Sequence, residues 1–142
     1  MGNVVVKEKV DFSEEVNLRH FNLLRSVGRG SFGKVRIVER RDTKKLYALK
    51  YISKAECIRM EALTNVFRER DILEDVDHPF VCNLRFAFQD EEYMYMVIDL
   101  MMGGDLRFHI TRRRFIENVI RFWIAEMACA IRYLHSQGIV HR

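Results

Sequence analysis

The chain has 142 residues, of which 49% are hydrophobic and 31% are charged, and its formal net charge is +4 at pH 7. This length suits one ordinary domain, and the composition is that of a globular protein, which excludes the disordered and fibrous classes. The positive charge could suit an anionic partner, but the basic residues are scattered and the aromatic residues fall at core spacing, which argues against a nucleic-acid-binding protein.

Nothing in the sequence predicts attachment to a membrane. No run approaches the roughly 18 consecutive apolar residues of a membrane span, and residues 1–9 lack the apolar core of a secretory signal. Gly2 follows Met1, as in N-myristoylated proteins, but Val6 stands where that signal has Ser or Thr. We therefore expect an intracellular, cytoplasmic protein without a transmembrane segment or a lipid anchor.

Three cysteines are present, Cys57, Cys82 and Cys129, and they lie far apart in the sequence. None has the close Cys or His partners at the spacing that zinc sites need. The pattern therefore predicts reduced thiols packed in the interior and no bound metal.

The first two thirds of the chain predict a sheet with one helix. Residues 1–20 show no sustained period and predict a tail or a strap at the edge of the domain. From Phe21 the pattern becomes β-like, with a glycine cluster and a charged turn between apolar runs. The predicted order is βββαββ: strands over 21–27, 35–38, 46–52, 84–88 and 93–100, with a helix over about 60–76 after the third strand.

The remaining residues predict helices. Two glycines end the last strand, and Asp105 is a good N-cap for a short helix. A longer helix is predicted over residues 118 to about 136, with Asn118 as its candidate cap. Apolar residues from Val119 to Leu134 lie nearly all round it, so we expect this helix to belong inside a larger core.

The sharpest local feature is a G-x-G-x-x-G-x-V motif between the first two predicted strands. It reads Gly28-Arg29-Gly30-Ser31-Phe32-Gly33-Lys34-Val35. Glycines let a turn bring backbone N–H groups close to phosphate oxygens without an intervening Cβ. The dinucleotide-binding version of the motif needs a helix directly after it, whereas residues 35–38 predict a strand, which argues against a Rossmann domain. A glycine-rich hairpin without a ligand is the structural alternative.

A lysine and a glutamate fall at positions predicted to face inward. Lys50 lies in an apolar strand, where an ammonium is costly unless an anion meets it. Glu69 lies within the apolar stripe of the following helix, which contains Ala62, Val66, Leu73 and Val76. Each side chain alone could reach water at the rim, but two inward positions favour an ion pair between them.

These motifs occur in the order in which protein kinases carry them: the glycine motif, Ala48-Leu49-Lys50, the helical Glu69 and the closing Ile139-Val140-His141-Arg142. Four shorter patterns add detail: His78-Pro79-Phe80, Phe88-Gln89-Asp90-Glu91-Glu92, Met96-Val97-Ile98-Asp99 and Gly103-Gly104-Asp105-Leu106. Over residues 21–142 the sequence resembles serine/threonine protein kinases of the AGC group, and most closely its YANK branch.

The predicted fold class is α+β, with a five-stranded antiparallel sheet and one helix, then a hinge and the first helices of a helical lobe. In the terms of the kinase resemblance, residues 1–20 are an N-terminal segment. Residues 21–102 are then the N-lobe and hinge, and residues 103–142 are the start of the C-lobe.

The resemblance implies that ATP is the cofactor. The glycines would cover the phosphates, while Lys50, oriented by Glu69, would hold the α and β phosphates, so these two residues are the candidate catalytic pair. Val35 and Ala48 would sandwich the adenine above Leu106. The residues expected to bind the nucleotide are Val27, Gly28, Arg29, Gly30, Ser31, Phe32, Gly33, Val35, Ala48, Lys50, Asp99, Met101, Asp105 and Leu106.

Two of these assignments concern the segment after the last strand. The backbone of Asp99 to Met101, the hinge, would hydrogen-bond the adenine edge, as the resemblance implies. Asp105 would accept a hydrogen bond from the ribose, and the helix cap is an equally good interpretation of that residue.

In the family, the chain continues from His-Arg to an Asp that accepts the substrate hydroxyl proton, and then to the Asn and Asp that hold Mg²⁺. Arg142 is the last residue here. We therefore expect a kinase that transfers the ATP γ-phosphate to protein Ser or Thr with Mg²⁺, of which the 142 residues alone are inactive. The alternatives are a non-catalytic kinase-like fragment that binds a nucleotide or another protein, and an unrelated α+β module in which Lys50 and Glu69 do not pair.

Overall fold

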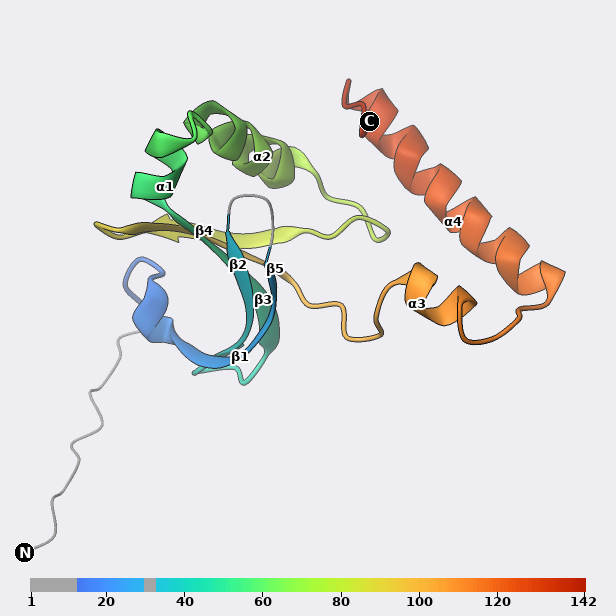
Figure 1. Cartoon of the computed structure of the whole chain (residues 1–142), viewed down its shortest axis with the longest axis horizontal. Helices are drawn as coiled ribbons and strands as arrows, with labels where there is room; N and C mark the ends of the chain where they lie inside the picture. The colour runs from blue at the N-terminus through green and yellow to red at the C-terminus, as the bar shows by residue number, and fades with distance from the viewer. Residues whose placement is uncertain (1–12, 30–32) are drawn as a thin grey trace, which may run out of the picture.

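The computed structural model describes residues 13–29 and 33–142, and one five-stranded sheet forms its centre (Figure 1). The strands are β1 (Phe21–Arg29), β2 (Lys34–Arg40), β3 (Leu46–Ser53), β4 (Leu84–Gln89) and β5 (Tyr93–Asp99). Their order in space is β1-β2-β3-β5-β4, and every neighbouring pair is antiparallel. The predicted α+β class and its five-stranded antiparallel sheet are confirmed.

The described helices are η1 (Leu18–His20), α1 (Lys54–Arg59), α2 (Leu63–Asp75), α3 (Leu106–Ile110) and α4 (Glu117–Ser136). The helix predicted over about 60–76 corresponds to α2, whereas the sequence does not predict α1. Ser53 caps α1 by accepting a hydrogen bond from the Glu56 N–H at 3.3 Å, and Glu61, with φ of 53°, separates the two helices. Six residues are too few for a helical period to show in the sequence.

The two later helices begin differently. The Asp105 side chain accepts a hydrogen bond from the Phe108 N–H at 2.7 Å, so the predicted cap of α3 is present. The predicted cap of α4 by Asn118 is wrong, because the cap position is Ile116, which makes no side-chain cap hydrogen bond. Glu117 instead places a negative charge in the first turn, which is favourable beside the helix N-terminus.

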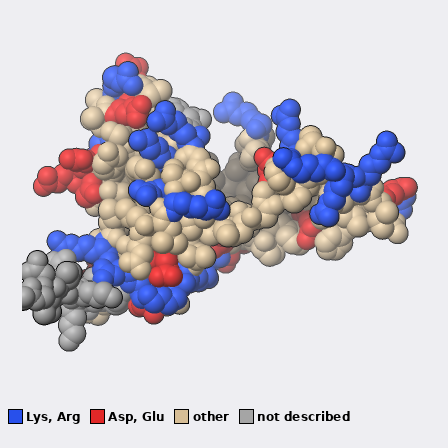
Figure 2. All heavy atoms as spheres, turned by 60° about the horizontal axis from the view of Figure 1, so that its bottom comes forward, with Lys and Arg blue, Asp and Glu red and all other residues tan. Residues whose placement is uncertain are grey.

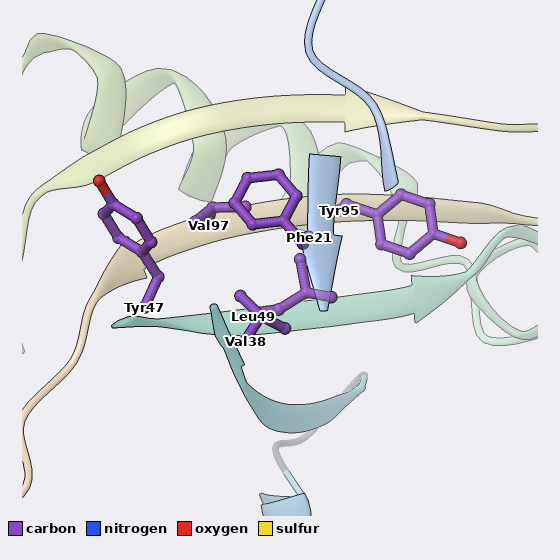
Figure 3. Close-up of a cluster of buried hydrophobic side chains, with 6 residues drawn as sticks. All are labelled: Phe21, Val38, Tyr47, Leu49, Tyr95 and Val97. Atoms are coloured by element: carbon purple, nitrogen blue, oxygen red, sulfur yellow. The ribbon is translucent and has the colours of Figure 1, made fainter. Parts of the chain in front are cut away.

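One face of the sheet carries an aromatic and aliphatic cluster, drawn in Figure 3: Phe21, Val38, Tyr47, Leu49, Tyr95 and Val97. The ring of Phe88 stacks on those of Phe21 and Tyr95, with centroids 6.0 and 5.0 Å apart. Val16 and Leu18 pack against the same cluster. Of the two alternatives for the N-terminal segment, residues 13–20 therefore form a strap over this face.

The opposite face of the sheet packs against α1 and α2. Its buried cluster consists of Ile52, Cys57, Val66, Met94 and Met96. Because side chains alternate along a strand, Leu49 and its odd-numbered neighbours face the aromatic cluster, while Ala48, Lys50 and Ile52 face the helices. The sequence of β3 thus places one lysine on the face that α2 covers.

A β-bulge in β4 lets that strand serve both faces. Leu84 is opposite Ile98, but Phe86 is opposite Val97, so Arg85 is an extra residue without a partner on β5. Leu84 accordingly packs against the cluster below α2, whereas Phe86 packs against the aromatic cluster. In a regular strand these two side chains would share one face.

The helical arm formed by α3 and α4 stands beside the sheet (Figure 1). The Asp77 N–H donates a hydrogen bond to the Tyr133 hydroxyl oxygen at 3.0 Å, and the His78 ring stacks on Tyr133 with centroids 4.9 Å apart. No residue of α4 is buried, and Ile124 and Met127 are 61% and 57% exposed. The described residues thus leave an apolar helix face uncovered. Among residues 13–29 and 33–142, no helix is long and apolar enough to cross a bilayer.

The aromatic cluster generates a prediction about stability. Leu49→Ala should lower the free energy of unfolding by about 3 kcal/mol, because it removes a buried side chain and leaves a cavity. Leu46→Ala is the matched control, since Leu46 lies in the same strand but is 40% exposed, and it should cost less than about 1 kcal/mol. Urea unfolding followed by circular dichroism measures both, and equal costs would contradict the assigned core.

The uncovered face of α4 generates a second prediction. Ile124→Glu combined with Met127→Glu should raise the highest protein concentration at which the 142-residue chain is still a monomer. The reason is that an exposed apolar patch favours association. Asn118→Glu combined with Ser136→Glu adds the same charge to polar positions of α4 and is the control. Light scattering against protein concentration measures the effect, and an equal effect of both pairs would contradict the role of this face.

Candidate functional site

An ion pair joins the sheet to α2. Lys50 Nζ on β3 lies 2.6 Å from Glu69 Oε1 on α2. The Lys50 side chain is 18% exposed and that of Glu69 is 39% exposed, so the pair sits at the edge of the buried cluster rather than in open solvent. Lys50 and Glu69 therefore do not each reach water alone. The alternative of an unrelated α+β module expected these two residues not to pair, so the ion pair argues against it.

Strand pairing places the first glycine of the motif in line with this pair across three strands. Gly28 on β1 is opposite Val35 on β2, Val35 is opposite Lys50 on β3, and Lys50 is opposite Met96 on β5. A Cβ added to Gly28 would meet no atom within 4 Å. Packing among the described residues therefore gives no reason for a glycine here, whereas close approach of a ligand would give one.

At Gly33, in contrast, packing within the sheet explains why the residue is a glycine. A Cβ at this position would lie 2.5 Å from the Tyr51 carbonyl oxygen and 2.8 Å from the Ile52 side chain. The close approach of Gly33 to β3 therefore excludes any larger residue. The predicted phosphate contacts of Gly30, Ser31 and Phe32 fall outside the described residues.

The candidate adenine-binding residues divide into two groups. Ala48 is buried and pairs with Ile98 of β5, while Val35 is half-buried on β2. Met101 and Leu106 lie in the segment after β5 and are 68% and 44% exposed. The structure thus gathers Val35 and Ala48 around Lys50, and places Met101, Asp105 and Leu106 beyond the last strand.

Two further candidates, Val27 and Arg29, lie at the end of β1 with exposed side chains. Arg29 is opposite Lys34, and both residues belong to the glycine motif, at the end of the β1–β2 pair where the chain passes from one strand to the other. Asp105 caps α3, as described above, and a contact with the ribose stays a prediction.

Sequence reasoning missed an ion pair at the end of β5. Arg85 donates two hydrogen bonds to the Asp99 carboxylate, from Nε to Oδ1 at 2.7 Å and from a terminal nitrogen to Oδ2 at 2.8 Å. The bonds from Arg85 hold the pKa of Asp99 below its usual range. No sequence pattern signals this pair, because the bulge that aims Arg85 is a product of strand pairing.

Cys82 lies against the same residue. Its thiol donates a hydrogen bond to the Asp99 carbonyl oxygen at 3.3 Å. Burial raises the pKa of the thiol, which keeps it protonated and able to donate. The prediction of packed thiols is confirmed for Cys57, which is buried, and wrong for Cys129, which is exposed because nothing described covers that face of α4.

Basic side chains do not gather into one stripe on the face that Figure 2 shows. Lys and Arg are spread there over the sheet and the helical arm, with Asp and Glu between them. In the part of the chain that the structure describes, no three His, Cys, Asp or Glu residues lie together as a possible metal site.

Comparison with known proteins identifies the family. The family model for the protein kinase domain matches residues 21–142. The chain is 53% identical over 133 residues to serine/threonine-protein kinase 32C of Mus musculus, and 51% identical over 133 residues to serine/threonine-protein kinase 32B of Homo sapiens. It is 38% identical over 131 residues to a RAC family serine/threonine-protein kinase homolog of Dictyostelium discoideum.

The alignments cover most of this chain but a minor part of each relative. They include 93% of the chain for both mammalian proteins and 92% for the Dictyostelium protein, against 27%, 32% and 30% of the respective relatives. The family match, the four ordered motifs and the five-stranded sheet with its lysine–glutamate pair agree with one another. The chain therefore belongs to the protein kinase domain family, with serine/threonine-protein kinases of the 32 type among its relatives.

Proposed function

We propose that this chain is the ATP-binding part of a serine/threonine protein kinase, an enzyme that transfers the γ-phosphate of ATP to Ser or Thr of a protein. The observation that supports this most is the ion pair between Lys50 and Glu69, which lies in strand register with Gly28. A lysine held in this way presents a cation two strands away from Gly28, with Val35 of β2 between them, and a Cβ at Gly28 would meet no atom within 4 Å.

The geometry suits a polyphosphate. An ammonium carries three donors, and the Glu69 carboxylate occupies one of them, which leaves donors for phosphate oxygens. Glu69 limits the freedom of the lysine side chain, so that less entropy is lost when a phosphate binds. Gly28 allows backbone groups of β1 to approach the same oxygens.

The purine would lie on the same face of the sheet. Val35 and Ala48 offer it apolar surface, and the backbone from Asp99 to Met101 offers hydrogen-bonding groups for its edge. Asp105 would accept a hydrogen bond from a ribose hydroxyl with the carboxylate that also caps α3. Val27, Arg29 and Leu106 complete the proposed contacts.

In protein kinases Mg²⁺ neutralises the charge that develops on the phosphates. The described residues include no cluster of candidate metal ligands, so we assign no residue of this chain to the metal. Lys50 and the β1 strand that carries Gly28 would contact the phosphates only from the side of the sheet. The protein substrate is left unassigned.

Replacement of the lysine tests the proposal. Lys50→Met should weaken ATP binding by about tenfold to hundredfold, because a charged hydrogen bond contributes about 1.5–3 kcal/mol. Glu69→Gln should weaken binding less, since the amide oxygen still accepts a bond from Lys50 but carries no charge. Calorimetric titration of the 142-residue chain with ATP measures both.

Lys44→Met is the matched control, because Lys44 lies in the β2–β3 turn with a side chain 68% exposed, and it should leave ATP affinity unchanged. A wild-type chain that binds no ATP, or a Lys50→Met chain that binds it equally well, would refute the nucleotide site.

A second candidate is a non-catalytic fragment that acts on another protein. The uncovered apolar face of α4 favours it, since exposed Phe122, Ile124 and Met127 can bury against a partner. A chain that binds no nucleotide but whose self-association depends on that face would support this second function over the first.

A further inference from the structure

Asp99 is held through every polar group it carries. Its carboxylate accepts the two bonds from Arg85, and its carbonyl oxygen accepts the bond from the Cys82 thiol. Its backbone N–H donates to the Asn83 carbonyl oxygen at 3.1 Å. All three partners lie in residues 82–85, where the chain passes into β4, so one short segment holds the side chain, the N–H and the C=O of the last residue of β5.

The bulge in β4 makes the side-chain part of this arrangement possible. Arg85 is the extra residue between the pairs of Leu84 with Ile98 and of Phe86 with Val97. A bulge bends its strand and re-aims a side chain. Here Arg85 has no paired residue on β5, and its guanidinium reaches Asp99, the residue after Ile98 on that strand.

The pair is a geometric restraint more than a source of stability. The Arg85 side chain is 42% exposed and that of Asp99 is 20% exposed, so solvent screens part of the attraction. A guanidinium that donates two parallel bonds to one carboxylate nevertheless fixes the orientation of both planar groups. A lysine has no such fork and cannot reproduce that restraint.

We propose that Arg85 is a positioning residue for the purine end of the nucleotide site, and that it acts through Asp99. The inference rests on the proposed function, in which the backbone from Asp99 to Met101 faces the adenine edge. β5 ends at Asp99, and the chain continues from there without regular structure to α3. Fixing Asp99 on β4 restrains the peptide groups that follow, so less freedom is lost when they bind a purine.

An ordinary surface ion pair is the competing explanation, since many such pairs contribute nothing measurable. Two observations distinguish this one. The same segment that supplies Arg85 also holds the N–H and C=O of Asp99, and the pair lies where the strand ends, next to the proposed purine contacts. A pair that served only to stabilise β4 would not need the backbone contacts.

The test compares ligands that use different ends of the site. Wild type, Arg85→Lys and Arg85→Gln are titrated with ATP, with purine riboside triphosphate, which lacks the 6-amino group, and with inorganic tripolyphosphate. Both variants should bind ATP about threefold to tenfold more weakly. They should lose less affinity for purine riboside triphosphate and none for tripolyphosphate, which contacts only the Lys50 end.

The control is Arg121→Gln, which removes an exposed ion pair with Glu117 on α4 and should change none of the three affinities. Equal losses for ATP and tripolyphosphate in the Arg85 variants would assign the pair a merely structural role and overturn the proposal. Unchanged ATP affinity would overturn it as well.

Amide hydrogen exchange gives a readout that needs no nucleotide. The amides of residues 99–102 should exchange several-fold faster in Arg85→Gln than in wild type, and at the wild-type rate in Arg121→Gln. Unchanged exchange in Arg85→Gln would overturn the proposal even if ATP binds. A wild-type chain that binds no ATP would refute the proposed function instead, while the exchange rates would still decide whether Arg85 holds this segment.

Discussion

An ammonium group among apolar side chains is stable only where an anion meets it, and Lys50 imposes this requirement on the fold. The lysine lies on the face of β3 that also carries Ala48 and Ile52, so its partner has to come from the helix that covers this face. Glu69 supplies the carboxylate at 2.6 Å. The ion pair therefore lies on the same side of α2 as Val66, which packs against Met94 and Met96.

The two faces of the sheet have separate tasks. The aromatic cluster on one face is closed by residues 13–20 and gives the sheet its buried core. The other face combines the smaller cluster under α2 with the half-open region around Lys50, Val35 and Gly28. A rigid scaffold on one side thus supports a site on the other, which is the arrangement that a precisely positioned charge requires.

Strand β4 contributes side chains to both clusters and also contacts Asp99 at the end of β5. Its bulge sends Leu84 to one cluster and Phe86 to the other, and it leaves Arg85 free to engage Asp99. The helical arm is attached more lightly, through the contacts of Tyr133 with Asp77 and His78. No residue of α4 is buried among the described residues.

The sequence by itself determined the five strands, the position of α2 and the pairing of Lys50 with Glu69, because alternation and helical periodicity are local consequences of which face is buried. It did not reveal α1, which is too short to show a period, and it misassigned the cap of α4 to Asn118. Only the tertiary structure showed that Gly33 is required by its contact with β3, and that Arg85 reaches Asp99. Both depend on how neighbouring strands pair, and strand register is a relation between distant segments that no local pattern contains.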